Sequence, residues 1–153
     1  KARWTISENE RVVFVGKYGN ACGGVDGVSP YSDVYRVLQT VNNRGTFAEG
    51  LLTPGVGTCS SFADMYDDHV FIALCTPLQD CIRHVLQRRK VKGNTKPYDP
   101  HNLLRKAESV LSWADRLEDA GLNVARLTYE EAYLSTLELL GLQPPSVEYI
   151  LGE

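Results

Sequence analysis

The chain has 153 residues, which is enough for one domain with a sizeable buried core. Hydrophobic residues make up 43% of the sequence and charged residues 23%, as is typical of globular proteins. No apolar run approaches the roughly 20 residues that a membrane-spanning helix needs. The net charge of −3 does not indicate general binding to nucleic acid.

The cysteines and the N-terminal residues indicate the cellular compartment in which the chain is expected to fold. The four cysteines, Cys22, Cys59, Cys75 and Cys81, form no C-x-x-C pair, and the chain has only three histidines. We therefore expect no zinc site and a reducing cytoplasm. Lys1 to Glu10 is polar and unlike a signal peptide. The chain starts without Met, so the natural N-terminus can lie further upstream.

The first half of the chain alternates strand and helix signals. Residues 11–16 (RVVFVG) are β-branched and aromatic, which predicts a buried strand. A glycine-rich loop, residues 17–29, follows it, and the pattern then predicts a helix from Pro30 to about Asn42. Residues 46–49 (TFAE) predict a short strand, and the prolines and glycines of residues 51–61 predict a loop.

The second half repeats this alternation. Residues 69–75 (HVFIALC) are the clearest buried strand, and a helix is predicted from Pro77 to about Lys90. A further helix is expected over about 102–120, and a strand over 123–127. Thr128 opens the last helix, with a glutamate three residues on as in a capping box.

Buried runs separated by helices predict an α/β fold, a parallel sheet with helices on both faces. Ligands bind such sheets at the carboxyl ends of the strands. That rule predicts one edge that gathers Lys17 to Asp26, Glu49-Gly50, Cys75-Thr76 and Thr128-Tyr129.

Charge is concentrated in one segment. Between Arg83 and Lys106 the chain has eight Lys and Arg against a single acid, Asp99. This net +7 leaves −10 on the rest of the chain. The contrast favours a local anion site, although a solvated helix face is the alternative.

The passage HVFIALCTPLQDCIRHVLQRRKVKG (69–93) combines a strand, Thr-Pro, a helix and an arginine cluster. It resembles P-loop nucleoside and nucleotide kinases, where such a helix leads into a lid whose arginines close on the transferring phosphates. The resemblance assigns this role to Arg88 and Arg89, with Arg83 in substrate binding. The alternative is an ordinary helix end, where cations are favoured anyway.

Two further passages extend the resemblance. GTFAEGLL is similar to the family's second acidic strand, and its Glu49 is expected to help to place the metal–phosphate group or to contact the substrate. GKYGNACGGVDGV contains one acid, Asp26, the candidate general base towards the acceptor hydroxyl. An exposed acid and a tight turn are the alternatives for these two carboxylates. Four residues of the loop are expected to bind the substrate: Lys17, Tyr18, Gly23 and Gly24.

The sequence also departs from the family. The Walker A motif G-x-x-x-x-G-K-[ST] does not occur in it. The resemblance therefore implies a single kinase-like α/β domain over 1–153, a three-layer sandwich without its first, central strand and P-loop. Residues 11–16 and 45–49 are expected to form one strand pair and 69–75 and 123–128 another. A segment upstream, or a partner chain, is expected to complete the sheet.

Three segments are similar to those of phage-encoded P-loop kinases that phosphorylate 5-hydroxymethyluracil bases in DNA: GNACGGVDGV, EGLL and TPLQDCIRHVLQRRKVKGN. The resemblance implies ATP and Mg²⁺, a nucleoside, nucleotide or DNA acceptor, and the host cytoplasm. Two other functions stay open: a non-catalytic α/β module that binds a nucleotide or a partner, and another P-loop transferase such as a sulfotransferase.

Overall fold

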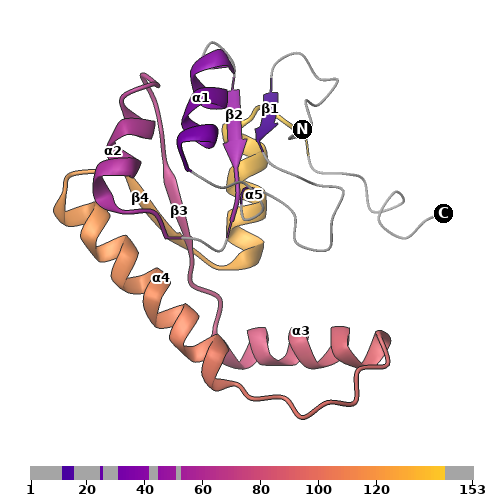
Figure 1. The fold of residues 1–153 in the computed structure, drawn as a ribbon. Coiled ribbons are helices and arrows are strands. Elements are labelled where there is room, and N and C mark those ends of the chain that lie inside the picture. Colours follow the sequence, from indigo (N-terminus) through magenta and orange to yellow (C-terminus); the bar gives the residue numbers. More distant parts are fainter. Residues whose placement is uncertain (1–11, 16–24, 26–30, 42–44, 51–52, 144–153) are drawn as a thin grey trace. The chain divides into compact units, whose positions relative to one another are not determined.

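The computed structural model describes residues 12–15, 25, 31–41, 45–50 and 53–143 (Figure 1). The chain divides into two compact units, Lys1–His69 and Val70–Glu153. The described elements of the first unit are β1 (Val12–Val15), α1 (Tyr31–Val41), β2 (Gly45–Ala48) and α2 (Val56–Ala63). Those of the second are β3 (Phe71–Leu74), α3 (Leu78–Val91), α4 (His101–Asp119), β4 (Val124–Leu127) and α5 (Tyr129–Leu139).

In the first unit, β1 and β2 pair in parallel, with Val15 opposite Ala48. Val13 and Val15 fall on the same face of β1 because side chains alternate along a strand. Val34 and Leu38 of α1 pack against that face, and these four side chains are at most 5% exposed. The apolar stripe of α1 thus forms the core of this unit with β1.

Helix α2 corrects the prediction of a loop over residues 51–61. It begins after Gly55 and buries Cys59 and Ala63. The sequence VGTCSSFA has low helix propensity, so local signals favour a loop there. Burial of the two small side chains stabilises the helix instead.

In the second unit, β3 and β4 also pair in parallel, with Phe71 opposite Val124 and Ala73 opposite Arg126. Strand alternation puts these four side chains on one face, and α4 covers it. The Phe71 ring meets the Trp113 ring edge to face, with the centroids 6.1 Å apart. The buried side of α4 consists of Trp113, Ala114 and Leu117.

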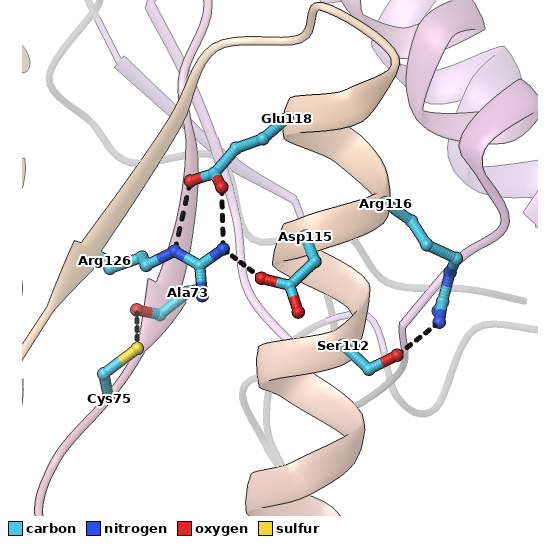
Figure 2. Close-up of polar contacts among 7 residues, drawn as sticks. All are labelled: Ala73, Cys75, Ser112, Asp115, Arg116, Glu118 and Arg126. Atoms are coloured by element: carbon cyan, nitrogen blue, oxygen red, sulfur yellow. Dashed lines mark hydrogen bonds and ion pairs between the residues drawn. The ribbon is translucent and has the colours of Figure 1, made fainter.

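A polar network joins β4 to α4 at the surface (Figure 2). Arg126 Nε donates a hydrogen bond to Glu118 at 3.1 Å, and its Nη2 lies 2.7 Å from Glu118 and 2.6 Å from Asp115. The hydrogen bond from Arg126 holds the pKa of Glu118 below its usual value. The two carboxylates in turn raise the pKa of Arg126. The network therefore fixes the register of the helix against the strand.

Helix α3 and the loop after it project from the rest of the second unit (Figure 1). We call residues 78–100 the arm. No residue of α3 is fully buried, and Leu86 and Val91 are 47% and 83% exposed. The helix ends in a Schellman motif, in which Gly93 has a φ of 63° and the Asn94 amide donates to the Arg89 carbonyl. The arm thus packs against α4 without fully burying any residue of α3.

These observations confirm an α/β fold with parallel strand pairing. The two predicted pairs, β1–β2 and β3–β4, both form. Within the described residues, each strand has one neighbour only. Leu74 at the end of β3 is 52% exposed, although the sequence of this strand predicts a buried one. In the part of the chain that the structure describes, no helix is long and apolar enough to cross a membrane.

Candidate functional site

The carboxyl ends of β3 and β4 meet in one small network. The Cys75 amide donates to the Leu127 carbonyl at 2.7 Å, which extends the strand pairing by one residue. Beyond it, the Tyr129 amide donates to the Thr76 hydroxyl at 2.9 Å. The prediction that Cys75 and Thr128 lie at the same edge is therefore confirmed for this strand pair.

A capping box rigidifies the same edge. The Thr128 hydroxyl accepts from the Glu131 amide, and the Glu131 carboxylate accepts from the Thr128 amide at 2.8 Å. The hydrogen bonds from the Thr128 amide and hydroxyl lower the pKa of Glu131. The predicted capping box is thus present, and it orients α5 from the strand end onwards.

In the first unit, one residue of the loop after β1 is hydrogen-bonded to the backbone at the end of β2. The Val25 amide donates to the Glu49 carbonyl at 2.7 Å, while the Glu49 side chain is exposed. Asp26, the proposed base, is the next residue in the chain. Together with the other four loop candidates it lies outside the described residues: Lys17, Tyr18, Gly23 and Gly24.

The predicted lid arginines differ in their surroundings. Arg83 forms an ion pair with Asp80 at 2.6 Å, and its side chain is 70% exposed. Arg88 is exposed. Arg89 is partly buried because its guanidinium lies over the Tyr98 ring, 5.6 Å from the centroid. It also donates a hydrogen bond to the Lys96 carbonyl. Arg89 thus fastens the returning loop onto the last turn of α3.

Sequence reasoning missed Tyr98. Its hydroxyl is buried without a hydrogen-bond partner in the described part of the chain. An aromatic residue between Pro97 and Pro100 reads as ordinary loop, so only the fold of the arm reveals its contact with Arg89. Thr76, by contrast, is marked in the sequence by its place between a buried strand and Pro77.

Two open hollows lie on the basic segment. One, of about 430 Å³, lies where the returning loop meets α3. It is lined by Leu86, Arg89, Lys90, Gly93, Asn94, Thr95, Lys96 and Tyr98. The other, of about 550 Å³, lies on the first turns of α4 and is lined by Asn102, Arg105, Lys106 and Ser109. Both present cationic side chains, which suits anionic groups.

The carboxylates of the described residues bear on metal binding. Among the described residues, no three His, Cys, Asp or Glu side chains come together as a metal cluster. Mg²⁺ in phosphate-transfer sites needs only one or two carboxylates besides the substrate phosphates. The exposed Glu49 at the end of β2 fits that requirement in chemistry.

The chain resembles two phage kinases. It is 29% identical over 130 residues to "5-hmdU DNA kinase" of Pseudomonas phage PaMx11, a match that covers 82% of this chain and 69% of that protein. It is 27% identical over 128 residues to "5-hmdU DNA kinase" of Delftia phage PhiW-14, covering 71% and 48%. The chain therefore spans about half the length of the second relative. No family model matches it, and no solved structure does.

Proposed function

We propose that the chain is part of a phage phosphotransferase that moves the γ-phosphoryl group of ATP to the hydroxyl of a hydroxymethylated pyrimidine base in DNA. The observation that carries this proposal is the similarity to two phage proteins named 5-hmdU DNA kinase, which extends over 71–82% of the chain. The parallel strand pairs and the arginine-bearing helix α3 after β3 support it, because they match the order of strand, helix and lid arginines that the resemblance implies.

In this proposal, the acceptor hydroxyl attacks the γ-phosphorus, ADP leaves, and the hydroxyl proton passes to the Asp26 carboxylate. Arg88 binds the oxygens on which charge develops. Mg²⁺ would neutralise the phosphates beside Glu49. Arg89 is proposed as the second lid arginine, because its contacts with the Tyr98 ring and the Lys96 carbonyl leave further N–H donors of the guanidinium for phosphate oxygens.

The loop around Asp26 is proposed to bind the pyrimidine base of the acceptor. Lys17, Tyr18 and Arg83 are proposed to bind the substrate, and Gly23 and Gly24 would let the backbone approach a flat ring closely. The base must leave the helical stack to bring its hydroxyl to a carboxylate, which costs a few kcal/mol in duplex DNA.

The phosphate cradle is proposed to come from outside the 153 residues. The Walker A motif is absent from the sequence, and a transferring triphosphate needs such a cradle. Within the described residues β3 has β4 as its one neighbour, which leaves its other edge for a further parallel strand. A segment upstream in the natural protein, or a partner chain, would supply that strand and the P-loop.

The proposal is tested by offering γ-labelled ATP with four acceptors in parallel. These are DNA with and without 5-hydroxymethyluracil, the free nucleoside, and the free nucleotide. We expect label only on the modified DNA, and we expect it from the natural full-length protein but not from residues 1–153 alone. Label confined to the free monomers would leave a kinase of nucleotide metabolism. No label on any acceptor would favour a binding module.

A further inference from the structure

The arm and the start of α4 combine dense positive charge with high exposure. Between Arg83 and Lys106 the net charge is +7, in a chain whose remainder carries −10. The cations that are exposed in the structure include Lys90, Lys92, Lys96, Arg105 and Lys106. Because the rest of the chain repels polyanions, any contact with one is focused on this segment.

Few of these positive charges are neutralised by ion pairs within the described residues. Within the described residues, the only ion pair on the segment joins Arg83 to Asp80. The one acid inside the segment, Asp99, accepts a hydrogen bond from the His101 amide. Lys90, Lys92 and the cations of α4 therefore keep their charge available to a ligand.

The charge is also spread too widely for one small anion. Lys90 and Lys96 line the hollow on the arm, whereas Arg105 and Lys106 line the separate hollow on α4. On α4 the lining residues Asn102 to Ser109 lie at helical spacing on one face and span about 10 Å along the axis. A DNA strand presents one phosphate charge every ~3.4 Å along its axis, so several successive phosphates match a row of this length, whereas a single small anion does not.

We infer that this surface holds the sugar–phosphate backbone of the DNA substrate. It comprises Lys90, Lys92, Lys96, Arg105 and Lys106 and is called the backbone surface below. The inference rests on the proposed function for the identity of the polyanion, but the surface itself rests on charge, exposure and the two hollows. Arg89 is a positioning residue for it, because its hydrogen bond holds the Lys96 carbonyl on α3.

The test measures binding of a fluorescent single-stranded DNA oligonucleotide across a series of salt concentrations, in the absence of ATP. The variant Lys92→Gln/Lys96→Gln removes two charges from the backbone surface. The control, Arg36→Gln/Arg116→Gln, removes two charges that are also exposed but lie outside the basic segment. Lys92→Arg/Lys96→Arg retains the charge, and circular dichroism verifies that all variants fold.

Each lost phosphate contact lowers the slope of log K against log salt by about 0.7 on single strands. The test variant should therefore lose about 1.4 from its slope, while the control and the arginine variant keep the parental slope. Equal losses in the test and control variants would overturn the inference, since they would reflect net charge alone. Weakened ATP binding with unchanged DNA binding would overturn it too, because the surface would then serve the nucleotide.

Failure of the proposed function gives a different result. A full-length protein that transfers no phosphoryl group, but whose DNA binding responds to the lysines as expected, overturns the kinase proposal and supports the backbone surface. If the full-length protein phosphorylates modified DNA, but the lysine substitutions leave the slope of log K against log salt unchanged, the kinase proposal is supported and the backbone surface is overturned.

Discussion

Replacement of Arg89 by alanine should loosen the loop of the arm without unfolding the second unit. The side chain makes two contacts, a hydrogen bond to the Lys96 carbonyl and a cation–π contact with Tyr98. A hydrogen bond from a charged group contributes about 1.5 kcal/mol. A cation–π contact at a partly exposed site adds about 0.5 kcal/mol. The sum of about 2 kcal/mol corresponds to roughly 30-fold in the opening equilibrium of the loop.

Amide hydrogen exchange measures that opening directly. The Lys96 amide, which donates to Asn94 Oδ1 at 3.1 Å, reports on the loop. The Leu104 amide, which donates to the Pro100 carbonyl at 3.0 Å, reports on α4. In Arg89→Ala, exchange at Lys96 should rise roughly 30-fold while Leu104 stays near the parental rate.

Arg88→Ala is the matched control, because it removes the same side chain one position away and changes helix propensity equally. Exchange at Lys96 should not change in it, since Arg88 is exposed. Equal acceleration of exchange at Lys96 in the two variants would refute the role of the Arg89 contacts in holding the loop, as it would show that loss of charge or of helix stability opens the loop.

Three further predictions follow from the same contacts. In the complete enzyme, Arg88→Ala should lower kcat by up to about 10³-fold with little change in substrate binding, and unchanged turnover would return Arg88 to a solvated surface role. Thr128→Ala removes the capping box and should lower the free energy of unfolding by about 1 kcal/mol in urea titrations; no loss would show that the Glu131 contact contributes nothing. Because Arg126 depresses the pKa of Glu118, their contact stabilises the fold above the unfolded Glu value of about 4.3 and is lost as pH falls through the lower folded value. The stability difference between the parent and Glu118→Gln should therefore shrink between pH 7 and pH 3, and a difference that grows on acidification would contradict the assignment.

The secondary structure was largely predictable because its signals are local. The β-branched run at Val12–Val15 and the stripe of α1 carry their periodicity in the sequence itself. Gly121 and Gly141 follow the ends of α4 and α5, and both have positive φ values, 77° and 65°, in Schellman motifs, as glycines often do at helix ends. Helix α2 was not predictable, since VGTCSSFA has low helix propensity and the burial of Cys59 and Ala63 is visible only in the fold.

The candidate site was predictable only in part. Parallel pairing puts the ends of β3 and β4 side by side, so Thr76 and Thr128 follow from the strand pattern. The different surroundings of Arg88 and Arg89 could not be predicted from the sequence, because two neighbouring arginines at a helix end have the same local pattern. Only the folded loop, which brings Tyr98 to Arg89, distinguishes them. The order of all four strand ends along one edge stays a prediction, as does a single domain over 1–153.

The most direct test of the kinase proposal identifies the phosphorylated product inside DNA. DNA that contains 5-hydroxymethyluracil is incubated with ATP and the natural full-length protein, digested by nucleases to mononucleotides without any phosphatase, and analysed by mass spectrometry. We predict a modified mononucleotide heavier by one phosphoryl group, which disappears in Asp26→Asn while that variant keeps its fold. Unaltered 5-hydroxymethyluracil in DNA that the protein demonstrably binds would contradict phosphoryl transfer to the base.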